Sequence, residues 1–173
     1  MTGRIVVLTG ERGVGKSTVC HKTVALVQAR QYTCCGILTM SHPDGNRDVL
    51  DVQSGAVRRL TLEPEATSGV AQGRFCFDPA ALAWGDDVLS QILACDLLVV
   101  DELGPLEIER GAGWPKAFDA LRDANFKLAL VVVRPELLVQ AQLKLPASAT
   151  AVFTVTPQNR DGLPEVLGGM IKK

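Results

Sequence analysis

"RIVVLTGERGVGKST", residues 4–18, is the stretch that decides how the rest of the sequence is interpreted. Residues 4–9 are a short, mostly apolar and β-branched run, which is typical of a strand buried on both faces. The following residues fit the pattern G-x-x-x-x-G-K-[ST], and apolar side chains after Lys16 recur at helical spacing. A strand, a glycine-rich turn and a helix in this order predict a phosphate-binding loop.

Each residue type in this loop has a chemical reason. Glycines let the backbone wrap closely, so that successive N–H groups point at phosphate oxygens, and the helix start adds partial positive charge. Lys16 is expected to reach the β- and γ-phosphates, and the Ser17 hydroxyl is expected to bind Mg²⁺. The alternative is a glycine-rich turn before an ordinary helix. The predicted nucleotide-binding loop comprises Gly10, Glu11, Arg12, Gly13, Val14, Gly15, Lys16, Ser17 and Thr18.

A second motif, "LLVVDELGPLE" (97–107), places Asp101 at the carboxyl end of a predicted buried strand. In a parallel sheet this end lies at the same edge as the phosphate loop, where Asp101 would hold Mg²⁺ through water, as Walker B acids do. Its alternative role is to cap a loop. Glu102 follows directly and is a candidate to orient the attacking water, or else a solvated loop acid. The adjacent pair is characteristic of the additional-strand, catalytic-glutamate division of such folds.

Further charged residues are candidate members of the site, each with an alternative role. The bend at Gly104-Pro105 either returns Glu107 to the site or leaves it as a surface acid. Arg134, after a strand predicted at 127–133, is a candidate cation for the transferred phosphoryl group. Its alternative role is to start a helix before Pro135. Arg12 and Arg110 are weaker candidates for the same role.

The remaining pattern alternates strands and helices. Strands are expected at 4–9, 34–40, 47–53, 56–62, 74–78, 96–102, 127–133 and 150–156, and helices at 16–30, from Pro79 to about Ala94, at 114–124, from Pro135 to about Leu143 and after Asn159. Residues 63–73 hold too many breakers for anything but a loop. This order predicts one three-layer α/β domain over residues 1–173, a P-loop NTPase fold. Its mainly parallel sheet has helices on both faces and a small antiparallel hairpin at one edge.

Composition limits the setting of the protein. Of the 173 residues 47% are apolar, the net charge is −1, and no basic tail or charge block occurs, so neither a nucleic-acid nor a membrane surface is expected. The five cysteines have no CxxC spacing and indicate reduced, mostly buried thiols in a cytoplasmic protein. No signal peptide or membrane span is expected.

These motifs resemble a small family of nucleoside triphosphatases whose vertebrate member is called the cancer-related nucleoside triphosphatase. The resemblance runs nearly end to end, and beyond the two motifs above it is carried by "GILT", "RDVLDVQSG", "GRFCFDPAAL" and "NRDGL" (159–163). It implies a monomer with magnesium-dependent hydrolysis of ATP, GTP and other nucleoside triphosphates to the diphosphate and phosphate, with broad base specificity. It also implies that Asn159 and Arg160 lie near the nucleotide base, where Arg160 would stack on a base face. Their alternative roles are a helix-capping asparagine and a surface arginine.

The chain departs from this family at Arg134, where small or hydroxylated residues and a histidine are common, at Pro105, where a basic residue is common, and over 111–115.

Two other functions stay open. A kinase for a small molecule or nucleotide needs an acceptor pocket and usually a basic lid, for which 56–75 offers Arg58, Arg59 and Arg74. A nucleotide-dependent switch or assembly factor with slow turnover would need a partner protein.

Overall fold

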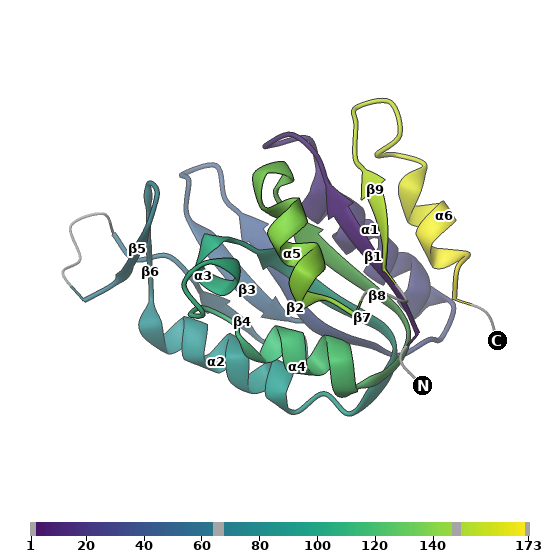
Figure 1. The fold of residues 1–173 in the computed structure, drawn as a ribbon, viewed down its shortest axis with the longest axis horizontal. Helices are drawn as coiled ribbons and strands as arrows, with labels where there is room; N and C mark the ends of the chain where they lie inside the picture. The colour runs from purple at the N-terminus through teal and green to yellow at the C-terminus, as the bar shows by residue number, and fades with distance from the viewer. Residues whose placement is uncertain (1–2, 64–67, 147–149, 172–173) are drawn as a thin grey trace.

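The computed structural model describes residues 3–63, 68–146 and 150–171. Seven strands of this described chain form one sheet, in the order β4-β3-β2-β7-β8-β1-β9 (Figure 1). The strands β2, β7, β8, β1 and β9 pair in parallel, and the antiparallel strands β3 and β4 extend one edge, as predicted. The strand bounds are β1 Arg4–Thr9, β2 Cys34–Ser41, β3 Arg47–Asp51, β4 Val57–Arg59, β7 Ala94–Leu103, β8 Asn125–Val133 and β9 Thr150–Thr154.

The central strand of the phosphate-binding half is β8. It pairs with β1 on one side (Val6 with Leu130) and with β7 on the other (Val99 with Leu130). One strand is therefore inserted between the strand that leads into the phosphate loop and the strand that carries the acidic pair. The adjacent acids at the end of β7 are characteristic of this additional-strand arrangement.

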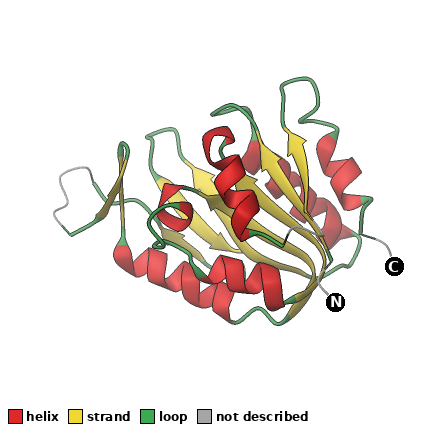
Figure 2. Cartoon of the chain, viewed as in Figure 1, coloured by secondary structure: helices red, strands yellow, loops and turns green. Residues whose placement is uncertain are grey.

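Helices cover both faces of the sheet, which gives the three layers predicted (Figures 1 and 2). One face carries α1 and α6, and the other carries α2, α4, α5 and two short helical turns. The bounds are α1 Lys16–Ala29, α2 Pro79–Ser90, α3 Pro105–Ile108, α4 Lys116–Asp123, the 3₁₀ turn η1 Pro135–Leu137, α5 Leu138–Lys144 and α6 Leu163–Gly168.

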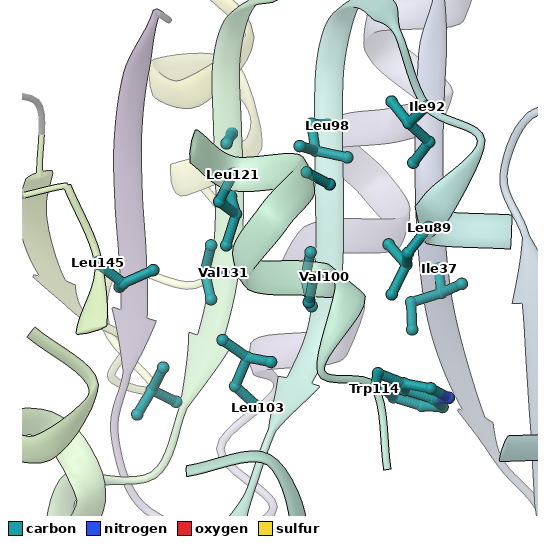
Figure 3. Packing of buried hydrophobic residues seen from close by; sticks show 14 of the residues in the cluster. Ile37, Leu89, Ile92, Leu98, Val100, Leu103, Trp114, Leu121, Val131 and Leu145 are labelled. Carbon is teal, nitrogen blue, oxygen red and sulfur yellow. The ribbon is translucent and has the colours of Figure 1, made fainter. Parts of the chain in front are cut away.

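Because helices cover both faces of the sheet, the central strands are apolar at successive positions and do not alternate apolar with polar residues. Along β7, Leu98 and Val100 face the layer of α2 and α4, where Leu121 packs, whereas Leu97 and Val99 face the layer of α1 (Figure 3). All four strand side chains are fully buried. Such strands read as continuous apolar runs because neither face meets water.

The structure differs from the sequence-based expectation in several elements. The strand expected at 56–62 is formed only over Val57–Arg59. The expected loop 63–73 contains a strand, β5 Val70–Gln72, which pairs with β6 Phe75–Phe77 in a separate two-stranded sheet. The connecting Gly73 has φ 58°, as a tight hairpin turn requires; residues 64–67 of this loop lie outside the described part. Helix α2 ends at Ser90, earlier than expected, because β7 already begins at Ala94. The short helix α3 was not expected.

Two general features bear on the setting. Cys20, Cys34, Cys35 and Cys95 are buried, as expected for reduced thiols. Within the described ranges, no helix is both long and apolar enough to cross a bilayer.

Candidate active site

The phosphate loop connects β1 to α1, and two of its glycines have backbone reasons for being there. Gly10 has φ 140°, and a Cβ at this position would lie 2.5 Å from the carbonyl oxygen of Val155. Gly15 has φ 109° and stands directly before the first turn of α1. Both positions exclude ordinary side chains, so the glycines of the motif are required by the conformation of the loop.

Lys16 lies across the loop that precedes it. Its Nζ donates to the carbonyl oxygens of Gly10 (2.7 Å) and Glu11 (2.9 Å). Burial lowers the pKa of Lys16, and the nearby carboxylates of Glu102 and Asp101 oppose this effect. A phosphate group that displaced these carbonyl contacts would find an oriented, partly desolvated cation.

Asp101 joins the phosphate loop to the acidic strand. It is 0% exposed at the end of β7. Its Oδ1 accepts from Ser17 Oγ (3.1 Å), and its Oδ2 accepts from Thr39 Oγ1 (3.0 Å) and Thr39 N (3.3 Å). Burial raises the pKa of Asp101, and the hydrogen bonds from Ser17 and Thr39 work in the opposite direction. The two sequence motifs therefore meet at the expected edge of the sheet.

Glu102 and Arg134 form an ion pair at the ends of the neighbouring strands β7 and β8. Arg134 Nε donates to Glu102 Oε1 over 2.6 Å, and the side chains are 33% and 20% exposed respectively. The pairing of β7 with β8 shifts register between Val100 and Leu103, just where the acidic pair lies. Within the described chain no group donates to the other carboxylate oxygen, Oε2, and Glu102 lines the phosphate cleft.

A cleft of about 340 Å³ brings these side chains together. One wall is the phosphate loop, and the other comes from β2, β3 and the ends of β7 and β8. Lys16, Glu102 and Arg134, which the sequence proposed as catalytic, all line it. The lining residues are Gly10, Arg12, Gly13, Gly15, Lys16, Ser17, Thr18, Ser41, Arg47, Glu102, Arg134, Pro135 and Glu136.

Arg47 also lines this cleft, although no sequence motif pointed to it. It is the first residue of β3, at the edge of the sheet, and it comes from the hairpin rather than from a phosphate-binding motif. The only signal in the sequence was its place in "RDVLDVQSG", which carried the family resemblance but no chemistry.

A second cavity, of about 630 Å³, adjoins the outer side of the phosphate loop. It is lined by Glu11 and Val14 of the loop, by Leu138 of α5, and by the segment after β9, including Arg160. Arg160 also donates from Nη1 to the Val14 carbonyl oxygen over 3.3 Å, which holds its guanidinium against the loop.

The sequence predicted that Asn159 lies with Arg160 near the nucleotide base. In the structure the Asn159 side chain instead makes hydrogen bonds to nearby backbone groups. Its Oδ1 accepts from Thr156 N (2.9 Å), and its Nδ2 donates to the Thr154 carbonyl oxygen (2.8 Å). These contacts shape the turn after β9, and the side chain is not among those lining the second cavity.

Glu107 is not a surface acid, because it is only 5% exposed. Its Oε2 accepts from Gly104 N (2.9 Å) and its Oε1 from Trp114 N (3.1 Å), so it closes the turn that follows β7. Burial raises its pKa to about 7. It lines a pouch of about 40 Å³ together with Glu102 and Arg134.

Arg110, by contrast, is exposed and donates to the Ala71 carbonyl oxygen over 3.0 Å, away from the phosphate cleft.

Comparison with known proteins shows which family has this sequence. The family model described as NTPase matches residues 5–167. The chain belongs to the NTPase family. Two relatives, each called nucleoside-triphosphatase THEP1, span nearly its whole length. The protein from Methanopyrus kandleri is 31% identical over 92% of this chain and 91% of its own, and that from Thermofilum pendens is 28% identical over 96% and 94%.

Two solved structures share the fold of this NTPase. The solution structure of a human cancer-related nucleoside triphosphatase has a TM-score of 0.71 at 23% identity, covering 95% of each chain. The crystal structure of THEP1 from Aquifex aeolicus has a TM-score of 0.70 at 19% identity, covering 98% of this chain and 99% of its own. The three-layer fold and the family resemblance inferred from the sequence are confirmed.

The donor set of this NTPase fits a magnesium ion. Mg²⁺ prefers oxygen ligands and is usually held by one or two protein oxygens together with waters and substrate phosphates. The Ser17 hydroxyl and the buried Asp101 carboxylate offer such oxygens, 3.1 Å apart and beside the phosphate cleft. These two residues would hold the ion, Ser17 directly and Asp101 through water.

Proposed function

We propose that this NTPase hydrolyses nucleoside triphosphates to the diphosphate and phosphate with the help of Mg²⁺. The observation that carries the proposal is the meeting of the two motifs: Ser17 of the phosphate loop is hydrogen-bonded to Asp101, and Glu102, the next residue, faces the same cleft. Relatives that match over nine-tenths of their length are named nucleoside-triphosphatases, which supports the same reaction.

Each side chain of the cleft then has a task. Backbone N–H groups of the loop and the Lys16 ammonium hold the phosphates and take up charge that develops on the terminal phosphoryl group. Ser17 and Asp101 would hold Mg²⁺, which would supply positive charge to neutralise the phosphates. Glu102 orients the attacking water through Oε2 and accepts its proton. Arg134, held by Oε1 of the same carboxylate, is a cation within reach of the transferred group.

The second cavity is proposed to take the nucleotide base. Its wall combines backbone, aliphatic side chains and the planar guanidinium of Arg160, which can stack on any base without reading its edge. Broad base specificity follows from such a wall. We further propose that residues 1–173 act as one domain and that the protein is a monomer. A cytoplasmic location, also proposed, is in keeping with its free and mostly buried cysteines.

Transfer to an acceptor other than water is less well supported. The arginines expected of a basic lid are engaged elsewhere: Arg58 lies over the Trp84 ring (4.9 Å), Arg59 pairs with Asp48 (2.8 Å), and Arg74 lies over the Phe75 ring (5.0 Å). None of them lines the phosphate cleft.

Phosphate release from ATP, GTP, CTP and UTP, with and without Mg²⁺, tests the proposal. The protein should release phosphate without an added acceptor and only with Mg²⁺. Glu102→Gln should bind nucleotide normally but lose roughly 10²–10⁴ in turnover, since it removes a general base. Exposed Glu109, a few residues along the same segment, provides the matched control Glu109→Gln. Turnover that depends on an acceptor would favour a kinase, and undiminished turnover of Glu102→Gln would remove Glu102 from the mechanism.

A further inference from the structure

Arg47 brings a cation into the phosphate cleft from outside both phosphate-binding motifs. Its backbone N–H donates to Thr61 Oγ1 over 2.9 Å, which fixes the start of β3. Its side chain lines both the 340 Å³ cleft and the 40 Å³ pouch. Glu102 and Arg134 are the other residues that line both spaces, so Arg47 lies at the end of the cleft where hydrolysis is proposed to occur.

The Arg47 guanidinium has no anionic partner among the residues that the structure describes. Two other cations of the cleft have direct partners: Arg134 is paired with the carboxylate of Glu102, and Lys16 donates to neutral loop carbonyls. Arg47 is half-buried, and burial lowers its pKa, while the carboxylates of Glu102 and Asp101 oppose this effect. An arginine nevertheless stays charged in proteins. A charged, partly desolvated group without a counter-ion is stabilised by any anion that enters the cleft.

The Phe75 ring orients this guanidinium. The Arg47 Cζ lies 4.3 Å from the ring centroid, a cation–π contact. Phe75 belongs to β6, in the two-stranded sheet that lies apart from the main sheet in Figure 1. An aromatic face restricts a planar guanidinium to few orientations, so that less entropy is lost when it binds phosphate oxygens.

We infer that Arg47 is a phosphate-recognition residue that binds the terminal phosphate of a nucleoside triphosphate, and that Phe75 is its positioning residue. The guanidinium fork matches two phosphate oxygens, which gives Arg47 more geometric specificity than a lysine would have. Arg47 does not line the second cavity, which is proposed to take the base, so it distinguishes the number of phosphates and not the base. The inference rests on the proposed function only in that the phosphates occupy this cleft.

Binding of a fluorescent, non-hydrolysable β,γ-imido nucleoside triphosphate and of the matching diphosphate, both with Mg²⁺, tests this role without relying on turnover. Arg47→Ala should weaken triphosphate binding roughly 10- to 100-fold, as expected for the loss of charged hydrogen bonds, and diphosphate binding less than about 3-fold. Arg47→Lys should recover only part of the loss. Arg74 is exposed, lies 5.0 Å from the same ring and does not line the cleft, so Arg74→Ala is the matched control and should change neither affinity.

The positioning role of Phe75 is tested by a double-mutant cycle. Phe75→Leu should lower triphosphate affinity roughly 3- to 10-fold, and adding it to Arg47→Ala should cause no further loss, because the two residues act as one unit. Thermal unfolding of each variant shows whether it is folded. If folded Arg47→Ala keeps the wild-type ratio of triphosphate affinity to diphosphate affinity, the inference is overturned. If the affinity losses of Arg47→Ala and Phe75→Leu add in the double variant, the role of Phe75 is overturned. A protein that binds as expected but releases no phosphate would contradict the proposed hydrolysis and leave the inference standing.

Discussion

At the scale of single residues, the chemistry depends on how Asp101 is held. A buried carboxylate is costly unless its oxygens are hydrogen-bonded, and here both are. Ser17 reaches Oδ1 from the phosphate loop, and Thr39 reaches Oδ2 twice from β2. Thr39 does not line the phosphate cleft, so we expect its hydroxyl to act on the chemistry only by holding Asp101, which is proposed to help bind Mg²⁺.

Thr39→Val tests this function because it keeps the shape of the side chain and removes the hydroxyl. Asp101 would then keep only the backbone N–H of residue 39 on Oδ2. Outer hydrogen bonds of this kind typically change metal affinity by 10–100-fold. The Mg²⁺ concentration for half-maximal phosphate release should therefore rise at least roughly 10-fold, while turnover at saturating Mg²⁺ changes little. A magnesium titration of wild type and variant measures both, and an unchanged magnesium requirement would contradict the assigned role.

At the scale of elements, continuous apolar runs were predicted well and very short elements poorly. The run at 4–9 matched β1 to the residue, because residues 5–9 are all buried and Gly10 opens the phosphate loop directly after them. The strand β5 was missed because glycine and threonine around it read as breakers, although Gly73-Arg74 marks the tight turn that pairs it with β6. The helix α3 was missed because a helix of four residues has no periodicity to detect.

The turn between β7 and α3 is held by Glu107, and this makes its stability depend on pH. The pKa of Glu107 is about 7 in the folded protein, raised by burial from an ordinary value of 4.5. A raised folded-state pKa means that the folded protein binds more protons than the unfolded chain between these values. The stabilisation from Glu107 is therefore fully present below about pH 4.5 and is lost as the pH rises through about 7.

Glu107→Gln should remove this dependence. The free energy of unfolding of the wild type, measured relative to the variant, should fall by about 3 kcal/mol between pH 4.5 and well above 7, because one pKa unit corresponds to about 1.4 kcal/mol. Urea unfolding over this pH range measures the difference. Glu109→Gln, on the exposed end of the same turn, should follow the wild type. Parallel pH profiles for wild type and Glu107→Gln would show that Glu107 titrates normally.

At the scale of the whole molecule, the site is built from segments far apart in the chain. Residues 10–18, the pair at 101–102 and Arg134 meet because β1, β8 and β7 are neighbours in the sheet. The carboxyl ends of parallel strands share one edge of a sheet, so the sequence could predict that the phosphate loop lies close to Asp101. It could not predict the order of the strands, and therefore missed that Arg134 pairs with Glu102 and that Arg47 enters from the edge hairpin.

A ligand that contacts all of these segments should stabilise the whole fold. Binding to the folded state alone contributes RT ln(1 + [L]/Kd), which is about 2.7 kcal/mol at 100 times Kd. For a chain of this length each kcal/mol raises Tm by roughly 2–4 °C, so a magnesium–triphosphate complex at that concentration should raise Tm by roughly 5–10 °C. Thermal unfolding with a non-hydrolysable triphosphate measures the shift. Lys16→Ala should lose most of the shift at the same nucleotide concentration, since it removes the cation that spans the loop, and chelation of Mg²⁺ should reduce the shift in the wild type. An equal shift in Lys16→Ala would place the nucleotide somewhere other than the phosphate cleft.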